Sequence, residues 1–481
     1  MANFDKRLLA VYLLPFILFA VVVLTIYFNY GAEWDFIAHY LNAEALDSPS
    51  FLTALLPLSH GTSIYDSIVM GRGIYFEAYR APLSYVMMAV AIVASGRYAI
   101  PAYLAVVAAA FAAVSYYASR AFKINPLLFA ALIVSPYVIV FLSLFDSEEL
   151  LSFVALIGTL ALLRKGRWEA GLLFGLASLS KYTSLIFIPM LLLLGKPKKV
   201  AYAYAAFFIV TLPWMLFNYY AFGNPLYTYL AAINVAREAS LPSGISLQAL
   251  TIVFAFFIPA LVVLFVINAT SWKRLRVTEL LRRSGRDIGS IIIVLFVGLS
   301  LVEFLILGLH NSTFDQARYA YPLYIGLALA IAYAIERSGT ANVKIGRFVA
   351  SKAGVAAAIL ISFSVLSICL TAVAPYTLPH FDISFADASN SALYSSAAMS
   401  LRDLNISNCV VVSNAWVYMR YEGINAFSPF AYNATILRYP ALIFANVGVN
   451  KSSVELINIT RSYSYTGYSI YLPGNFLCAG K

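Results

Sequence analysis

Charged side chains are scarce in this sequence. Only 11% of its 481 residues are Asp, Glu, Lys or Arg, whereas 62% are hydrophobic and 15% are aromatic. Soluble domains contain about 25% charged and roughly 45–50% apolar residues, so this composition excludes a single water-soluble globule and intrinsic disorder. The sequence predicts a polytopic membrane protein.

Cysteine and the common motifs of soluble enzymes are also rare or absent. The three cysteines, Cys369, Cys409 and Cys478, show neither a CxxC nor a Cys/His spacing, which excludes a disulfide framework and a zinc site of the usual kind. The sequence contains no P-loop, no GxGxxG after a strand, no GxSxG and no HExxH. ATP-driven work within this chain is therefore not expected.

Apolar runs divide the first three quarters of the chain. A run must be about 20 residues long to cross the hydrocarbon core as one straight helix. We predict eleven membrane-spanning segments, at residues 8–28, 98–119, 126–145, 149–163, 168–179, 183–195, 200–217, 249–268, 288–309, 322–335 and 353–374. Residues 82–95 are apolar too, but fourteen helical residues rise only about 21 Å, so we place them at the membrane interface.

The distribution of basic residues sets the predicted orientation. Lys and Arg gather in the cytoplasmic loops of membrane proteins. With eleven spans, most of the 32 basic residues fall on one side, including those at 164–167, 196–199 and 273–286. This side is predicted to be cytoplasmic, with the N-terminus on it. The net charge of +10 therefore reflects membrane topology, and no nucleic-acid partner is expected.

After residue 374 the composition changes, because Asn, Ser and Tyr become common and the apolar runs shorten to strand length. We predict a helix at 391–403 and strands at 409–413, 442–446, 454–458 and 467–472. The domains are thus a transmembrane domain, 1–374, and a small α/β domain outside the cytoplasm, 375–481.

Acidic residues gather on the side opposite to the basic ones. In the first outer loop, residues 33–46 have helical spacing, with Trp34, Ile37, Leu41 and Ala45 on a face expected to lie toward the membrane. Asp35 and His39, four residues apart, share another face. The alternative is an interfacial helix whose charges only keep it at the surface.

The next outer segments also carry ionisable groups beside apolar runs. Asp146 and the following Ser147-Glu148-Glu149 lie between two spans, and such groups are costly near hydrocarbon unless they are paired or hydrated. Lys181 interrupts residues 168–195, which are too few for two full spans. The two helices there must therefore be short. Lys181 at their junction either snorkels toward water or neutralises an anion.

A last group of polar residues surrounds the ninth and tenth spans. Glu303 and His310 are seven residues apart, so they share one helical face and are able either to hold a divalent cation or to form a hydrogen-bonded polar seam. Arg318, at the start of the tenth span, suits bidentate binding of phosphate, or a structural salt bridge to Asp315 or Glu303.

The order of these motifs resembles the GT-C class of membrane glycosyltransferases, above all the branch of the dolichyl-phosphate-mannose protein mannosyltransferases and the bacterial aminoarabinose transferases. The resemblance covers about the first 340 residues. It is carried by Glu33-Trp34-Asp35, residues 75–83 (YFEAYRAPL with Glu77 and Arg80), Phe145-Asp146-Ser147, residues 175–181 (GLASLSK) and residues 318–322 (RYAYP). The family often has Asp-Glu where this chain has Trp34-Asp35, which leaves open whether Asp35 or Glu33 is the base. No WWD triad occurs in the tail, which argues against an oligosaccharyltransferase catalytic subunit.

The resemblance implies transfer of a sugar from a polyprenyl-phosphate donor to a hydroxyl of a protein, lipid or glycan at the outer membrane surface, with inversion. Asp35, Glu33 and Asp146 are the implied catalytic residues. Lys181, Arg318 and Arg80 would bind the donor phosphate. His39, Glu77, Glu303 and His310 are candidates for acceptor binding or for a divalent cation such as Mg²⁺ or Mn²⁺.

Two alternatives come from other functional classes. A secondary transporter of a small anionic solute also needs buried ionisable groups and interrupted helices, but it predicts related halves and charges near the bilayer midplane. A non-catalytic membrane assembly protein is the other alternative. The acids of this chain cluster in outer loops instead, which favours the transferase.

Overall fold

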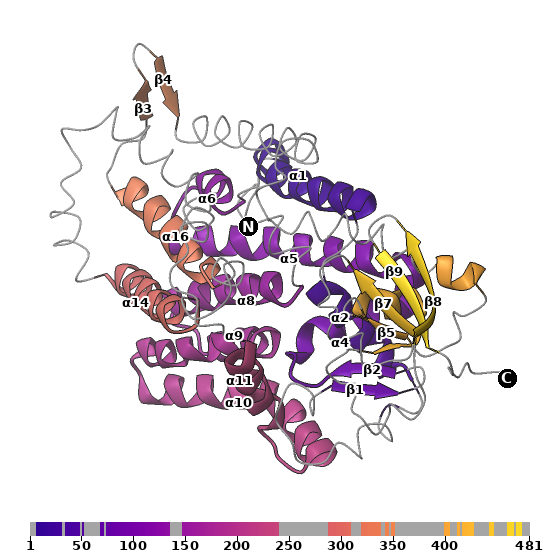
Figure 1. The fold of residues 1–481 in the computed structure, drawn as a ribbon. Helices are drawn as coiled ribbons and strands as arrows, with labels where there is room; N and C mark the ends of the chain where they lie inside the picture. Colours follow the sequence, from indigo (N-terminus) through magenta and orange to yellow (C-terminus); the bar gives the residue numbers. More distant parts are fainter. Residues whose placement is uncertain are drawn as a thin grey trace.

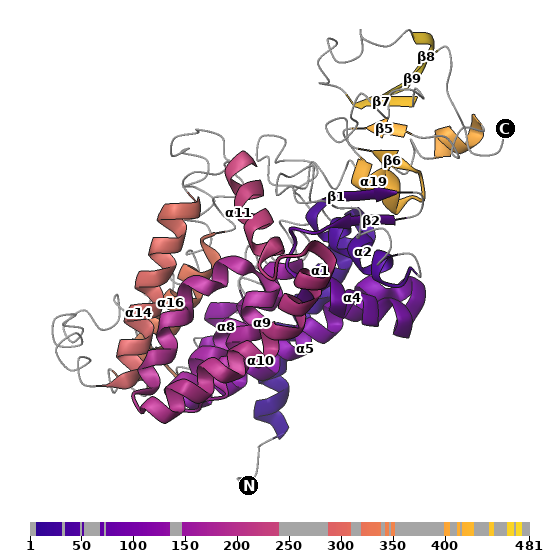
Figure 2. The same ribbon diagram turned by 90° about the horizontal axis from the view of Figure 1, so that it is seen from below.

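Helices make up most of the structure, a computed structural model. It describes residues 6–30, 34–48, 51, 68–71, 74–134, 147–239, 287–308, 319–337, 342–345, 348–351, 399–404, 411–413, 416–427, 442–446, 459–465 and 468–473. A bundle of long helices occupies one part of the molecule, and a small sheet lies beyond one end of it (Figures 1 and 2).

The described helices follow the predicted apolar runs closely. They are α1 (Lys6–Tyr30), α5 (Ala99–Phe122), α6 (Pro126–Ile133), α8 (Ser147–Arg164), α9 (Ala170–Ser180), η2 (Tyr182–Leu194), α10 (Pro197–Phe222), α14 (Ile288–Glu303), η3 (Phe304–Gly308) and α16 (Tyr321–Arg337). Within the described residues, three segments are long and apolar enough to cross a membrane: Pro82–Phe122, Pro197–Phe222 and Ile288–Leu307. The predicted spans 249–268 and 353–374 fall outside the described residues, so the number eleven stays a prediction.

Three further helices flank one end of the bundle. These are α2 (Trp34–Leu46), α4 (Pro82–Ser95) and α11 (Tyr227–Ala239). The α4 helix has the bounds expected for the interfacial segment and is joined to α5 through η1 (Gly96–Tyr98). Gly96 has a φ of 54°, a conformation that glycine adopts without strain and that separates the two helices.

The α9 helix and η2 form the short helical pair that the sequence predicts for residues 168–195. The two segments meet at Lys181, whose backbone is extended with φ −151° and ψ 118°. The Lys199 ammonium, in α10, donates a hydrogen bond to the Gly166 carbonyl, in the turn before α9, at 2.6 Å. Since the chain before α9 and the chain after η2 meet in this way, the pair is a hairpin with Lys181 at its tip.

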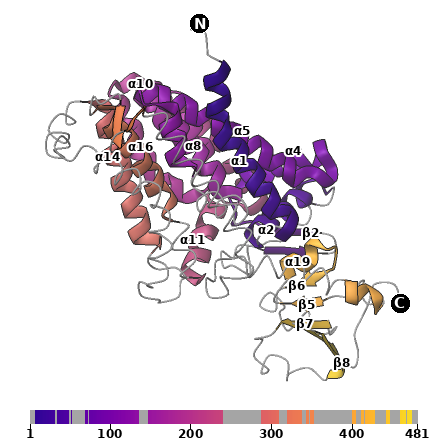
Figure 3. The same ribbon diagram turned by 90° about the horizontal axis from the view of Figure 1, so that it is seen from above.

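The two ends of the bundle differ in charge. Gly166 and Lys199 lie at one end, where Arg164 also pairs with Asp287 at 3.1 Å. The N-terminal end of α1 lies at this end too, away from α11 and the small sheet (Figures 2 and 3). The basic residues predicted to be cytoplasmic at 164–167 and 196–199 therefore share one end, and α2 lies at the other.

Close helix packing explains why glycines are needed in α9. A Cβ atom added to Gly171 would lie 1.9 Å from the carbonyl oxygen of Ala203 in α10. One turn later, a Cβ on Gly175 would lie 2.8 Å from Val210. The two helices thus touch backbone to backbone, as small residues allow in membrane bundles.

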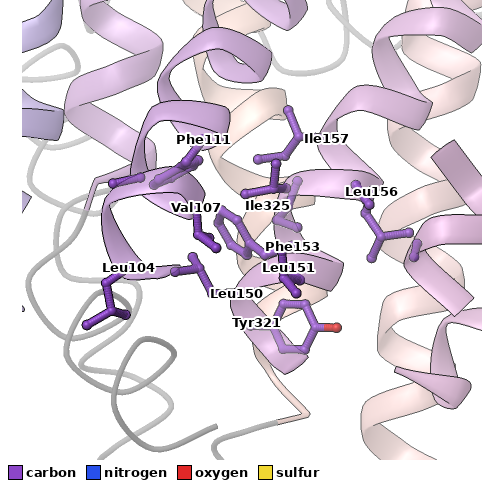
Figure 4. Close-up of a cluster of buried hydrophobic side chains, with 14 of the residues drawn as sticks. Leu104, Val107, Phe111, Leu150, Leu151, Phe153, Leu156, Ile157, Tyr321 and Ile325 are labelled. Carbon is purple, nitrogen blue, oxygen red and sulfur yellow. The ribbon is translucent and has the colours of Figure 1, made fainter. Parts of the chain in front are cut away.

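The core beneath the polar end is aromatic and aliphatic. Figure 4 shows Tyr321 of α16 among side chains of α5 and α8, including Phe111, Leu150 and Phe153. The rings of Phe111 and Phe153 are 5.4 Å apart and nearly perpendicular. The Tyr321 hydroxyl donates to Ser152 Oγ at 2.9 Å, so this core continues directly into polar groups.

Two small antiparallel hairpins were not predicted. The strand β1 (Ile68–Gly71) pairs with β2 (Ile74–Glu77), which places Ile68 opposite Glu77. The strand β3 (Asn342–Ile345) pairs with β4 (Phe348–Ser351). In the first hairpin, β2 ends at Glu77, just before the turn that leads into α4.

The C-terminal residues form a five-stranded mixed sheet. Its strands are β5 (Val411–Ser413), β6 (Ala426–Phe427), β7 (Leu442–Asn446), β8 (Ile459–Tyr465) and β9 (Tyr468–Pro473), in the spatial order β6-β5-β7-β9-β8. The strands β6, β5 and β7 run parallel to one another, whereas β9 runs antiparallel to both of its neighbours, β7 and β8. The short helix α19 (Trp416–Tyr421) contacts α2, where the rings of Tyr421 and Tyr40 are 5.3 Å apart.

Predictions for this region have mixed outcomes. The strands expected at 409–413, 442–446 and 467–472 correspond to β5, β7 and β9, and residues 399–403 are helical as expected. The strands β8 and β6 and the helix α19 were not predicted. The expected strand 454–458 and the boundary at 374/375 lie outside the described residues, so the division into two domains stays a prediction.

Candidate active site

An arginine between two carboxylates is the first feature of the polar end. Asp35 lies in the first turn of α2. The Nη2 atom of Arg80 lies 2.7 Å from Asp35 Oδ1, and its Nε atom donates to the Glu77 carboxylate. The side chains of Glu77 and Arg80 are 1% and 6% exposed, whereas that of Asp35 is 21% exposed. Asp35 is therefore the member of this cluster that water and a substrate can reach.

The turn that carries Arg80 is fixed by further hydrogen bonds. The Asn42 side chain, in α2, accepts from the Glu77 backbone N–H at 2.8 Å and donates to the Glu77 carbonyl at 3.1 Å. The Tyr79 hydroxyl donates to the Glu77 carboxylate at 2.8 Å. Burial raises the pKa of Tyr79 well above its usual value, and the nearby carboxylates of Glu77 and Asp35 act in the same direction. Tyr79 thus stays protonated and remains a hydrogen-bond donor.

His39 lies one helical turn after Asp35 and is fully buried. Its Nδ1 atom is 2.8 Å from Ser84 Oγ in α4, and its Nε2 atom is 3.3 Å from a Glu148 oxygen in α8. Its ring stacks against Tyr85. Both ring nitrogens thus contact neighbouring helices, so His39 links α2 to α4 and α8.

The placement of α2 differs from the expectation in one respect. Ile37, Leu41 and Ala45 were expected to face the membrane, but they are 3%, 5% and 3% exposed within the protein. The reason is that α4 and β2 pack against α2 and cover this face. The helix that carries Asp35 is therefore held inside the protein on several sides.

Lys181 forms the second feature of the polar end. Its ammonium group contacts the Glu149 carboxylate, in the first turn of α8. It also lies over the rings of Tyr319 and Tyr321, 4.9 and 5.1 Å from their centroids. The Lys181 and Glu149 side chains are 5% and 0% exposed. Of the two roles considered for Lys181, snorkelling to water does not occur.

Glu303 lies beside this pair, at the end of α14 and 1% exposed. Its charged neighbours are Lys181 and Glu149, and the Thr183 hydroxyl is close to it. Neither carboxylate oxygen of Glu303 forms a well-aligned hydrogen bond in the described part of the chain. Glu303 therefore faces the ammonium group and the carboxylate together.

The first turn of α8 connects the two features. Its consecutive residues Glu148 and Glu149 point to different partners, His39 in α2 and Lys181 in the α9–η2 hairpin. A second connection comes from Tyr182, whose hydroxyl donates to the Arg80 carbonyl at 3.3 Å. Asp35 and Lys181, far apart in sequence, thus belong to two polar clusters that are connected through the first turn of α8 and through Tyr182. Figure 1 shows α2, α4, α8 and α9 gathered around this region.

Several predicted site residues cannot be placed. Glu33, Asp146, His310 and Arg318 lie outside the described residues. Within those residues, no group of three or more His, Cys, Asp or Glu side chains could hold a metal ion. The metal pairing of Glu303 with His310 stays a prediction.

The structure adds residues that were not selected from the sequence. Glu149 is the partner of Lys181, Glu148 is the partner of His39, and Tyr319 and Tyr321 cover the ammonium group. The two glutamates were visible as charges beside an apolar run. Their separate partners follow from helix geometry, because consecutive helical residues point about 100° apart.

Comparisons with known proteins agree with this architecture. Residues 80–298 match the model of glycosyltransferase family 87, a family with the GT-C fold. The fold is similar to the crystal structure of ArnT from Cupriavidus metallidurans bound to undecaprenyl phosphate, with a TM-score of 0.54 and 10% identity over 95% of this chain and 97% of that one. No curated protein matches the chain significantly by sequence. The resemblance to GT-C membrane glycosyltransferases, including the aminoarabinose transferases, is thereby confirmed.

Proposed function

We propose that this chain is a membrane glycosyltransferase that takes a sugar from a polyprenyl-phosphate donor. The match to glycosyltransferase family 87 and the ArnT-like fold support a GT-C glycosyltransferase. The polyprenyl-phosphate donor is our extension, and it agrees with the undecaprenyl phosphate bound to ArnT. The observation that carries the proposal is that the accessible carboxylate of Asp35 and the cation of Lys181 lie in two polar clusters at the same end of the bundle, connected through α8 and Tyr182.

Asp35 is the base in this proposal. As the acceptor hydroxyl attacks the anomeric carbon, its proton passes to the Asp35 carboxylate, and the bond from that carbon to the phosphate oxygen breaks. The electron pair leaves with the lipid phosphate. A single displacement of this kind inverts the anomeric configuration. Arg80 fixes the orientation of the Asp35 carboxylate through their 2.7 Å contact.

Lys181 and Arg318 bind the donor phosphate in this proposal and stabilise the charge that develops on the leaving group. Arg318 directly precedes Tyr319, whose ring lies over the Lys181 ammonium group. Arg80 contacts two carboxylates, so we assign it to Asp35 rather than to the phosphate. Asp146 directly precedes the first turn of α8 and is our candidate for orienting the acceptor.

The site lies at the outer membrane surface in this proposal, with the N-terminus in the cytoplasm. The support is the separation of basic and acidic residues to opposite ends of the bundle. Grooves between the helices would hold the isoprenoid chain, and the sheet next to α2 would border the path of the acceptor. The acceptor is a hydroxyl of a protein, a lipid or a glycan.

A donor panel tests this function. The purified chain in detergent is offered polyprenyl-phosphate monosaccharides with a mixture of acceptor hydroxyls, and release of the lipid phosphate is measured. We expect turnover of at least one donor without any ion gradient. Solute uptake by reconstituted vesicles, with no donor turnover, would instead favour a transporter.

A further inference from the structure

The Lys181 ammonium group already has an anionic partner inside the protein. The Glu149 carboxylate contacts it directly, and both side chains are almost completely buried. The rings of Tyr319 and Tyr321 lie on the same ammonium group. Any phosphate that binds to Lys181 must therefore compete with Glu149.

Charge makes this competition unfavourable to a phosphate. Glu303 is the second buried carboxylate near Lys181. Its oxygens form no well-aligned hydrogen bond in the described part of the chain. The Glu149 carboxylate balances the charge of the Lys181 ammonium group, and Glu303 places two more carboxyl oxygens beside this pair. In a buried, low-dielectric place, the Glu149 carboxylate repels an incoming anion.

We propose that Glu149 occupies, before the donor binds, the position at Lys181 that the lipid phosphate takes during the reaction. In this arrangement Glu149 and Glu303 set the affinity for the donor, and Glu149 keeps the buried ammonium group paired until the donor arrives. The exchange replaces a carboxylate by a phosphate at the same cation, and no covalent bond changes. This inference rests on the proposed function, because it takes Lys181 to be the phosphate ligand.

The arrangement also explains why an enzyme would keep a buried carboxylate here. A buried ammonium group without a partner is strongly destabilising, since the charge loses water and gains nothing in return. Glu149 therefore stabilises the donor-free protein. It also lowers donor affinity, so the lipid phosphate is released more readily after transfer.

Binding of undecaprenyl phosphate to the full-length protein in detergent tests the proposal. We expect Glu149→Gln to bind the lipid roughly tenfold more tightly than the unmodified chain, because the competing charge is gone. Glu303→Gln should bind it more tightly as well, by a smaller factor. Glu169→Gln is the matched control: its exposed carboxylate pairs with Arg167 at the opposite end of the bundle, and the lipid affinity should not change.

Two measurements separate this role from a merely structural one. Glu149→Gln should melt at a lower temperature without lipid and regain most of that loss when undecaprenyl phosphate is added, because the phosphate then pairs with Lys181. In a Lys181→Met background, Glu149→Gln should no longer tighten lipid binding. Weaker lipid binding in Glu149→Gln, or equal tightening with and without Lys181, would overturn the exchange.

The outcome also distinguishes the two proposals. If the unmodified chain binds undecaprenyl phosphate but Glu149→Gln does not bind it more tightly, the exchange is wrong while the proposed function stands. If neither protein binds any polyprenyl phosphate, the proposed function itself fails.

Discussion

The Arg80 guanidinium lies 2.7 Å from Asp35 and also donates to Glu77, so one cation orients two carboxylates of different exposure. Glu77 and Arg80 are buried, whereas Asp35 is 21% exposed. The buried pair thus holds Asp35, the proposed base, in place.

Arg80→Lys tests whether the Arg80 guanidinium holds Asp35 in place. Lysine keeps the charge but lacks the planar fork that reaches two carboxylates at once. We expect donor turnover to fall by roughly 10²-fold, the scale of a misplaced catalytic group. Turnover is measured beside Arg97→Lys, because Arg97 is exposed between α4 and α5 and has no carboxylate partner among the described ion pairs. Full activity of Arg80→Lys would contradict the role given to Arg80.

His39→Leu tests the attachment of α2. The substitution leaves Ser84 and Glu148 without their contacts to the imidazole. We expect the free energy of unfolding to fall by about 1–3 kcal/mol, the scale of one buried hydrogen bond that loses a partner, and turnover to fall with it. Ser84→Ala removes only one of the two contacts and should show a smaller loss. Equal thermal stability of all three proteins would show that the imidazole contacts contribute nothing.

Gly171→Ala tests the close contact of α9 with α10. The new methyl group would lie 1.9 Å from the Ala203 carbonyl oxygen, so the helices must separate. We expect a loss of about 1–3 kcal/mol or more, as for other overpacked cores. Gly298→Ala is the control, because a Cβ there meets nothing within 4 Å. Thermal unfolding in detergent compares the two, and a harmless Gly171→Ala would refute the backbone contact.

Thiol labelling tests the orientation in the membrane. In a chain whose native cysteines are replaced by serine, Asp47→Cys lies just after α2 and Glu169→Cys lies between α8 and α9. We expect a membrane-impermeant maleimide to label Asp47→Cys in intact cells and Glu169→Cys only after permeabilisation. The reverse pattern would invert the predicted topology.

The sequence was sufficient to predict helices whose signal is local. The hairpin around Lys181 follows from chain length alone, because 28 residues between two basic clusters are too few for two full spans. The bounds of α2 and α4 likewise follow from hydrophobic spacing. In these cases, the information lies within one segment.

Pairings between segments could not be predicted in the same way. Glu149 and Lys181 are 32 residues apart, and Asp35 and Arg80 are 45 apart, so their contacts depend on how helices pack. The β1–β2 hairpin did leave a local signal, since Gly71-Arg72-Gly73 separates two short apolar runs. The burial of Ile37 by α4 and β2, in contrast, depends on tertiary contacts that hydrophobic spacing alone does not specify.

The most direct test of the account compares the unmodified chain with Asp35→Asn. The measurement is the rate of lipid-phosphate release from the best donor, with donor affinity determined in parallel and Asp47→Asn, an exposed position just after α2, as the control. We predict that Asp35→Asn still binds the donor but releases no lipid phosphate above background, while Asp47→Asn retains full activity. Equal release by Asp35→Asn and the unmodified chain would contradict the assignment of Asp35 as the base.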